Sequence, residues 1–229
     1  MVSRAEEVKY IAEADQAHAA AENARAEARR TNAEAARLEV EARNAELTER
    51  LKLATDEHNQ VYRYNDDISY ASVEKCIDQI SKWHRLSPGC PIEIVFNSEG
   101  GDISAGMSLF DFLRRMSAEG HEITTGCEGM AASTAGVLLQ TGDRRWMGKQ
   151  SWLLIHRSSF HVGGSTYEVE DELKTIRRVE ARIIDIFKNR TGGKLTGAKI
   201  RANWRRADWW IESEDCLKLG LVDELKGDK

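Results

Sequence analysis

The distribution of glycine and proline divides this chain into two parts that cannot fold alike. All 17 glycines and both prolines lie at or after Pro88, and the first 57 residues contain neither. Those first residues are instead rich in Ala, Glu and Arg, which are strong helix formers. Because nothing in this stretch interrupts a helix, we predict one long helix over roughly residues 3–57.

Alanine recurs along the predicted helix at the spacing of a coiled coil. A seven-residue repeat contains Ala5, Ala12, Ala19, Ala26, Ala33, Val40, Leu47 and Ala54, and a second alanine-rich seam runs from Ala14 to Ala45. Alanine buries little apolar area, so self-association through it is weak unless the backbones approach closely. Two alternatives therefore stay open: a solvated or partly disordered arm, and an arm that forms a coiled coil or docks a partner.

Residues 58–229 have the pattern of an α/β domain. Short apolar runs typical of strands lie at 61–64, 92–96, 122–125, 145–147 and 152–155, and helical patterns lie at 73–86, 104–116, 133–139 and 166–189. Strands that alternate with helices of this length predict an α/β fold. We therefore expect two domains, a helical arm over residues 1–57 and an α/β domain over residues 58–229.

Composition and charge exclude several classes of function. A net charge of -5 argues against nucleic acid as the main partner, because phosphate binding needs a concentrated basic face. The sequence contains no run of about 18 apolar residues that could span a membrane, and its N-terminus lacks the apolar segment of a secretory signal. We therefore expect a cytoplasmic protein.

The cysteines and histidines do not predict a metal site. Cys76, Cys90, Cys127 and Cys216 lie far apart and form no CxxC motif, so we interpret them as reduced, buried thiols rather than disulfide partners or zinc ligands. The six histidines form no cluster at metal-binding spacing. We expect neither a metal nor an organic cofactor.

Two glycine-rich joints follow predicted strands and precede predicted helices. The first covers residues 97–101, and the second, residues 129–136, contains Ser133 between alanines and Thr134. Such a joint directs backbone N–H groups and a helix N-terminus toward one point, which stabilises negative charge. A serine there has the access that a nucleophile needs. Taken alone, however, the segment is better explained by an N-cap serine.

Two further residues have side chains that could support a serine nucleophile. His156 closes the apolar run 152–155; taken alone it is more simply a core residue, and the alternative is a general base for Ser133. Asp208, which precedes two tryptophans, is either a surface charge or the carboxylate that orients such a base.

Taken in order, these motifs resemble the ClpP family of self-compartmentalising serine peptidases. The matching segments are 97–101, 105–108, 129–133, 154–156, 208–211 and 220–223, within residues 61–225. The resemblance implies a ClpP/crotonase-like ββα superhelix domain. It also implies that Ser133 is the nucleophile, His156 the general base and acid, and Asp208 the orienting carboxylate. The backbone N–H groups of Gly101 and Thr134 would then form the oxyanion hole.

The resemblance also implies an assembly. Residues 163–189 are similar to the family's handle, a glycine-bearing strand and long helix that join two stacked rings. We therefore expect a homo-oligomer, either a heptameric ring or a double ring of fourteen. Two departures stand out: Glu99 replaces a proline that is usual in the family, and the long helix replaces a short N-terminal region that meets an ATP-driven unfoldase.

A ClpP-like domain behind a charged, alanine-rich helix is similar to the capsid maturation proteases of tailed bacteriophages. The leading hypothesis is a serine endopeptidase that cleaves capsid or scaffold protein, in the host cytoplasm or the procapsid. One alternative is a degradative subunit that works with an ATP-driven unfoldase, and another is a non-catalytic ring or scaffold assembly protein. A crotonase-type acyl-CoA enzyme is disfavoured, because it gives no reason for the ordered Ser, His and Asp.

Overall fold

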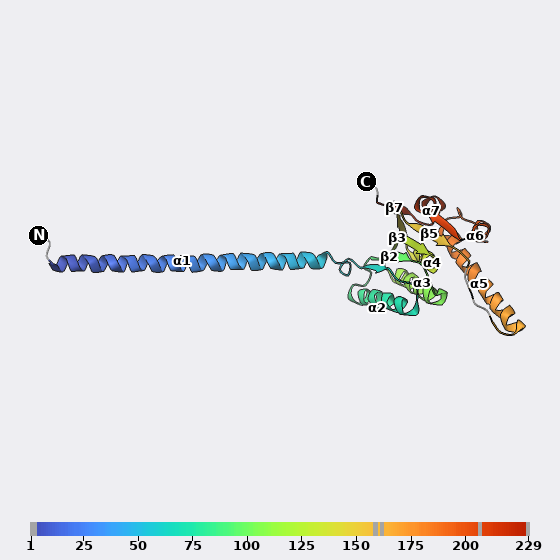
Figure 1. Cartoon of the computed structure of the whole chain (residues 1–229), viewed down its shortest axis with the longest axis horizontal. Coiled ribbons are helices and arrows are strands. Elements are labelled where there is room, and N and C mark those ends of the chain that lie inside the picture. Colours follow the sequence, from blue (N-terminus) through green and yellow to red (C-terminus); the bar gives the residue numbers. More distant parts are fainter. Residues whose placement is uncertain (1–3, 158–159, 161–162, 206–207, 228–229) are drawn as a thin grey trace. The chain divides into compact units, whose positions relative to one another are not determined.

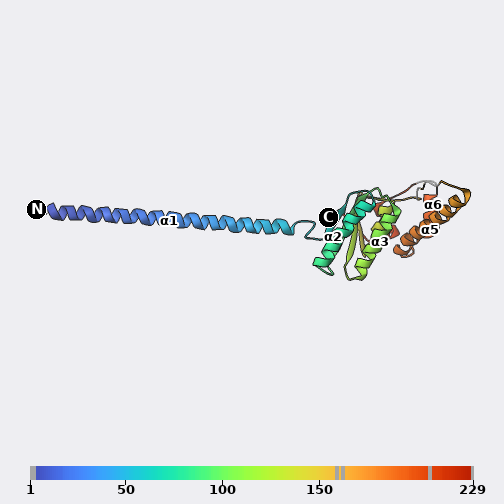
Figure 2. The same cartoon turned by 90° about the horizontal axis from the view of Figure 1, so that it is seen from below.

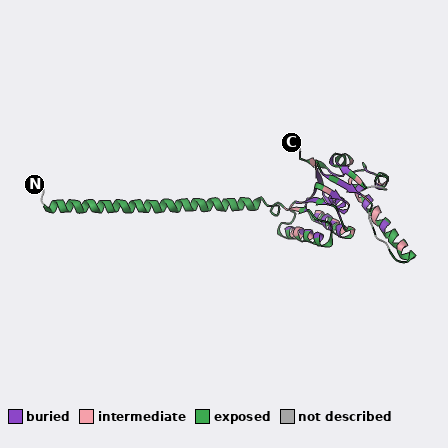
Figure 3. Ribbon diagram, viewed as in Figure 1, coloured by how far each residue is buried: buried purple, intermediate pink, exposed green. Residues whose placement is uncertain are grey.

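The computed structural model describes residues 4–157, 160, 163–205 and 208–227, and its contacts divide the chain into two units, Met1–Thr55 and Asp56–Lys229. The first unit is the predicted long helix, α1 (Arg4–Leu53), in which every described residue is exposed (Figures 1 and 3). The helix ends four residues before the predicted position 57. At its end the hydrogen-bond pattern tightens: the Ala54 N–H also donates to the Leu51 carbonyl and the Thr55 N–H donates to the Lys52 carbonyl, each at 3.3 Å.

The second unit alternates strands with helices, as predicted (Figure 1). Its strands are β1 (Val61–Tyr64), β2 (Ile92–Ser98), β3 (Ile123–Ala132), β4 (Arg144–Gly148), β5 (Trp152–Ile155), β6 (Trp209–Glu212) and β7 (Glu224–Lys226). Its helices are α2 (Tyr70–Leu86), α3 (Ile103–Ala118), α4 (Thr134–Leu138), α5 (Thr166–Arg190), α6 (Gly197–Trp204) and α7 (Ser213–Leu219), with a short 3-10 turn, η1 (Leu139–Thr141). The α/β fold class is confirmed.

One sheet organises this unit. Strands β1-β2-β3-β4-β7 lie in that order and are all parallel, while β6 pairs with β5 in the antiparallel direction. One edge of β3 pairs with β2, and its other edge has two partners in turn: residues 124–127 pair with β4, and residues 130–132 pair with β5. The end of β3 thus connects the main sheet to a smaller ladder formed by β5 and β6.

The length of β3 corrects one expectation. A strand was predicted only over 122–125, and residues 129–136 were interpreted as a glycine-rich turn. The strand instead continues to Ala132, because β5 provides a second ladder in which Met130 is opposite Trp152 and Ala132 is opposite Leu154. The strand-to-helix turn is therefore confined to Ser133.

Helices α2 and α3 lie side by side and contact the sheet (Figures 1 and 2). Each helix begins slightly before its predicted pattern, at Tyr70 and Ile103, because a capping residue precedes it. The Ser69 side chain accepts a hydrogen bond from the backbone of Ser72, and that of Asp102 accepts one from Ala105. These caps satisfy N–H groups that the first helical turn leaves unpaired.

The buried residues of helix α5 all lie at or after Ile176. Ser165 and Glu168 form a capping box at its start, and its buried residues are Ile176, Ile183, Ile184 and Phe187. Tyr167 and Leu173, nearer the start, are exposed. The glycine-bearing strand expected at the start of residues 163–189 is wrong, because residues 163–165 form no strand and α5 begins directly after them.

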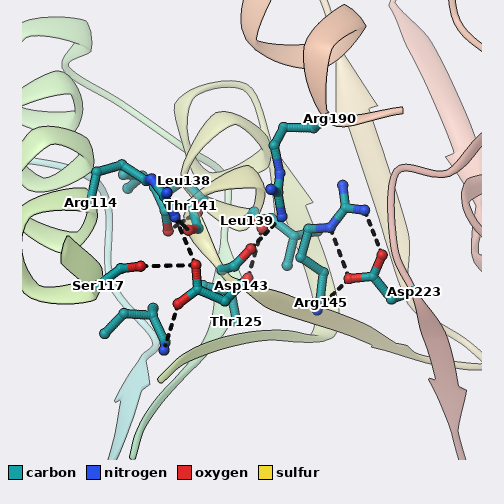
Figure 4. Close-up of polar contacts among 12 residues, drawn as sticks. Arg114, Ser117, Thr125, Leu138, Leu139, Thr141, Asp143, Arg145, Arg190 and Asp223 are labelled. Atoms are coloured by element: carbon teal, nitrogen blue, oxygen red, sulfur yellow. Dashed lines mark hydrogen bonds and ion pairs between the residues drawn. The ribbon is translucent and has the colours of Figure 1, made fainter. Parts of the chain in front are cut away.

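A polar network joins β4 to its neighbours (Figure 4). The buried Arg145 side chain donates to both carboxylate oxygens of Asp223, at 3.1 and 2.6 Å, and to the Gln140 amide oxygen at 2.8 Å. Asp143 accepts from the Arg114 guanidinium at 2.9 Å and from the Ile123 backbone N–H at 3.0 Å. The network fixes β4 and the residues around it without using the residues predicted to carry chemistry.

All four cysteines are free thiols, as expected, although Cys90 is only half-buried while the other three are buried. Burial raises the pKa of each thiol, that of Cys127 to about 12. A thiol with a raised pKa holds little thiolate near neutrality and is a poor nucleophile.

Candidate active site

Ser133 occupies the junction between β3 and α4 in a backbone conformation that is unusual for a residue with a side chain. Its φ is 54° and its ψ is -123°, and its N–H donates to the Leu154 carbonyl of β5 at 3.0 Å. Non-glycine residues with positive φ cost of order 1–3 kcal/mol and are concentrated at functional sites. Although Ser133 is at the N-cap position, its side chain makes no capping hydrogen bond. The simpler explanation offered by the sequence, an N-cap serine, is therefore correct for its position but not for its side chain, which does not cap the helix.

Ser133 and His156 line the same cavity. His156 follows the last residue of β5 and is half-buried. The other lining residues come mainly from α3, α4, β5 and α5: Ile103, Met107, Thr134, Val137, Ile155, Ile183 and Phe187. At about 20 Å³ the cavity has room for roughly one water molecule. The structure thus brings two of the three predicted triad residues to one small, mostly apolar space.

Asp208 lies just before β6 and is exposed. In the β5–β6 ladder Ile155 is opposite Trp209, so the same register carried one residue further sets His156 opposite Asp208. Residues opposite each other in an antiparallel pair are side-chain neighbours. Among the described residues, however, no hydrogen bond joins Ser133, His156 and Asp208. The ladder thus ends one residue short of both His156 and Asp208, and the described residues show no hydrogen-bonded triad.

The backbone of Gly101 is oriented by an isolated parallel bridge to Ile68. Ile68 donates to the Gly100 carbonyl and accepts from the Asp102 N–H, each at 2.7 Å. In such a bridge the N–H and the carbonyl of the central residue point away from the partner. Consistent with this, the Gly101 carbonyl accepts a hydrogen bond from the Thr134 hydroxyl at 3.0 Å. The Gly101 N–H therefore points toward the side on which Ser133 and Thr134 lie.

Gly100 allows the joint at residues 97–101 to approach Ser133. Its φ is +96°, and a Cβ atom there would lie 2.6 Å from the Ala132 carbonyl oxygen and 2.7 Å from the Ser133 Cβ atom. No side chain fits at such distances, so only glycine permits this contact. The neighbouring Glu99 is exposed and, with Asp66 and Asp67, lines a separate cavity of about 400 Å³.

Sequence reasoning missed the role of Ile68. It is buried and lies just after β1, where no motif marks it, yet its backbone orients the Gly101 peptide. Within the described part of the chain, no group of three or more His, Cys, Asp or Glu side chains could hold a metal ion. None of the helices that are described is both long and apolar enough to cross a bilayer.

Comparison with known proteins gives a consistent result. The family model described as Clp protease matches residues 47–229. An ATP-dependent Clp protease proteolytic subunit of Deinococcus radiodurans is 30% identical over 141 residues, which are 61% of this chain and 66% of that protein. The corresponding subunit 2 of Tropheryma whipplei is 32% identical over 62% of this chain and 78% of its own length. Subunit 1 of Chlamydia muridarum is 26% identical over 71% and 83%.

Proposed function

Because the chain belongs to the Clp protease family of serine peptidases, we propose that it is a serine endopeptidase whose triad is Ser133, His156 and Asp208. The proposed step begins when the Ser133 hydroxyl oxygen attacks a peptide carbonyl. His156 accepts the serine proton and then delivers it to the leaving amine. Water hydrolyses the resulting acyl-enzyme by the reverse sequence of proton transfers.

In this mechanism Asp208 accepts from the far ring nitrogen of His156 and fixes its tautomer. The backbone N–H groups of Gly101 and Thr134 stabilise the oxyanion, a contribution of about 2.7–4 kcal/mol per donor in other serine peptidases. Closure of the hydrogen bonds from Ser133 to His156 and Asp208 accompanies substrate binding, since catalytic hydrogen bonds often tighten only in the complex.

One observation carries the proposal: Ser133 has a strained backbone conformation, its side chain makes no capping hydrogen bond, and it lines a cavity together with His156. A structural serine at a helix start has no need of that conformation. Its hydroxyl would cap the helix, as Ser165 does for α5. The combination of strain, a free hydroxyl and a neighbouring imidazole matches the needs of an activated nucleophile.

A fluorophosphonate probe tests the nucleophile. The full chain should be labelled at Ser133 and should hydrolyse peptides, and Ser133→Ala should abolish both while the oligomer persists. Ser165→Ala is the matched control: it removes a genuine N-cap serine, so it should lower stability by about 1 kcal/mol and keep labelling. Peptide hydrolysis near the original rate in Ser133→Ala would contradict the proposal.

We also propose that the protein works as a homo-oligomeric ring and that its substrate is a capsid or scaffold protein of a tailed bacteriophage. The support for this role is α1, a helix in which no described residue is buried, in a chain whose second unit makes its own core. Such an arm is suited to location or partner contact rather than catalysis. Removing residues 1–55 should leave peptide hydrolysis unchanged, and mass spectrometry of phage-lysate products should identify capsid or scaffold fragments.

A second role is favoured by the relatives, which are named ATP-dependent Clp protease proteolytic subunits. In that role the chain degrades proteins that an ATP-driven unfoldase delivers. Stimulation of protein degradation by an unfoldase and ATP would favour this role over capsid maturation. A third role, a non-catalytic assembly protein, requires a ring that the fluorophosphonate probe does not label.

A further inference from the structure

A second, larger cavity lies between the end of β5, helix α5 and helix α6. Its volume is about 530 Å³. The charged and aromatic residues that line it are Arg157, Arg177, Glu180, Arg201, Trp204 and Arg205. None of them takes part in the proposed triad or oxyanion hole, so the mechanism leaves this cavity unexplained.

The cavity carries an excess of positive charge. Among the described residues that line it, Glu180 is the one carboxylate, and it is already paired with Arg157, whose Nε lies 3.0 Å from its Oε1. No described carboxylate pairs with Arg177, Arg201 or Arg205. Three guanidinium groups therefore face or border one concave space without a counter-charge.

The walls of this cavity strengthen the effect of the charges. Trp204 and Ile184 line it and are 5% and 3% exposed. A cleft with charge of one sign and apolar walls focuses the electric field and attracts the opposite ion. Guanidinium groups bind carboxylates through two parallel hydrogen bonds, so the preferred ligand chemistry is a planar anion.

The arginine-lined cavity is next to the Ser133 cavity. His156 lines the Ser133 cavity and the following residue, Arg157, lines the arginine-lined cavity. On α5, Ile183 and Phe187 line the first while Glu180 and Ile184 line the second. Consecutive Cα atoms are only about 3.8 Å apart. An extended peptide bound at Ser133 can therefore reach the arginines with a residue a few positions from the cut bond.

We propose that the arginine-lined cavity is a substrate subsite that binds acidic side chains, aspartate or glutamate, of a peptide held at Ser133. This inference rests on the proposed peptidase function and adds a substrate preference to it. Arg177 and Arg201 pair with the carboxylate, while Glu180 holds Arg157 at the edge of the site. The peptide carboxylate is the occupant we infer, because the proposed mechanism places the rest of the same peptide at the neighbouring Ser133.

The test uses the full chain and a series of internally quenched peptides that differ only in the position of one glutamate. Each has a partner with glutamine at that position. We expect the glutamate peptide to have at least a tenfold higher kcat/KM at one position or two adjacent ones. That ratio should fall toward one in Arg201→Gln and in Arg177→Gln. It should also fall as salt is raised, because charge pairing is screened.

Arg178→Gln is the matched control, because Arg178 is exposed on the same helix but does not line the cavity. It should keep both the peptide ratio and the individual rates. A ratio of one in the unmodified chain, with cleavage intact, would overturn the subsite and leave the peptidase proposal standing. A high ratio that survives in both cavity variants would also overturn it. A stronger response to phosphoserine than to glutamate would assign the cavity to phosphate instead.

If no peptide is cleaved, the peptidase proposal fails and the subsite is judged by binding. Calorimetric titration of Ser133→Ala with the glutamate and glutamine peptides then provides the measurement. Tighter binding of the glutamate peptide, lost in Ser133→Ala combined with Arg201→Gln, would support the subsite. Equal binding of the two peptides would overturn it.

Discussion

The Thr134 hydroxyl donates a hydrogen bond to the Gly101 carbonyl oxygen at 3.0 Å, and so ties together the two residues whose N–H groups we propose as oxyanion donors. Thr134 is buried and begins α4, whereas Gly101 is exposed and follows β2 in the chain. Neither backbone segment alone determines the distance between the two donors. The hydroxyl links them directly, in addition to the pairing of Ser98 with Ala131 and the bridge from Ile68 to Gly101.

Thr134→Val should therefore impair catalysis more than it impairs folding. Valine keeps the shape of the side chain and removes the hydroxyl, at a cost of about 0.5–1.5 kcal/mol for one hydrogen bond. We expect kcat for a reporter peptide to fall about tenfold with little change in KM. Thr125→Val is the control, because it removes a similar buried bond, from the Thr125 hydroxyl to the Leu139 carbonyl at 2.7 Å, outside the site. Equal loss of kcat in both variants would refute a positioning role.

The backbone strain at Ser133 predicts a difference between two inactive variants. Glycine adopts positive φ without steric cost, whereas alanine keeps most of the strain. Ser133→Gly should therefore unfold at a higher temperature than Ser133→Ala. We expect its free energy of unfolding to be larger by about 1 kcal/mol, after subtracting the entropy that glycine adds to the unfolded chain. Thermal unfolding followed by near-UV circular dichroism measures this. A lower melting temperature for Ser133→Gly would mean that the conformation is not strained.

A pair of glycine substitutions separates backbone strain from steric contact at the site. Gly100 and Gly120 have similar φ angles, +96° and +101°, but a Cβ atom at Gly120 would meet nothing within 4 Å. Both alanine variants should lose about 1–3 kcal/mol of stability from the backbone. Only Gly100→Ala should also abolish peptide hydrolysis, because its Cβ would push against Ser133 and the Ala132 carbonyl. Full activity in Gly100→Ala would show that this contact can relax.

The Arg145–Asp223 pair predicts how stability depends on pH. Partial burial alone would raise the pKa of Asp223, but hydrogen bonds and charge from Arg145 outweigh it and lower the pKa below its ordinary value of 3.8. A carboxylate with a lowered folded pKa stabilises the fold above its ordinary value, and the contribution is lost as pH falls through the folded pKa. Stability should therefore decline below about pH 4.

Asp223→Ala should reduce this dependence and cost about 2–3 kcal/mol at pH 7, because the Arg145 side chain, 5% exposed, is left without its carboxylate. Urea unfolding at pH 7 and pH 3 measures both effects. Asp215→Ala is a suitable control, since Asp215 pairs with Lys218 between two largely exposed side chains. An unchanged difference between the two pH values would remove Asp223 from the acid response.

The sequence predicted those elements whose pattern is local. Helix α5 and strand β5 have nearly the predicted bounds, because apolar periodicity and length determine them without help from distant residues. The carboxyl half of β3 was missed because its strand form depends on pairing with β5, more than 20 residues later. A glycine-rich segment carries no local signal for such a partner.

The candidate site divides in the same way. Ser133 and His156 could be selected from motifs, and the structure sets them on one cavity. The Ile68 bridge and the arginine-lined cavity could not, because each depends on segments that meet only in the folded chain. Arginines at 157, 177 and 201 are unremarkable in the sequence, and their shared cavity emerges from the packing of β5, α5 and α6.

Strand β3 belongs at once to the main sheet through β4 and to the smaller ladder through β5, and Ser133 comes directly after it. A displacement of the β5–β6 ladder relative to the main sheet would change the backbone conformation at this residue. A neighbouring subunit or bound protein that shifts β5–β6 would therefore also shift the backbone at Ser133. If Ser133 is the nucleophile we propose, the β5–β6 surface is thus a place from which binding would change its geometry without contact with substrate.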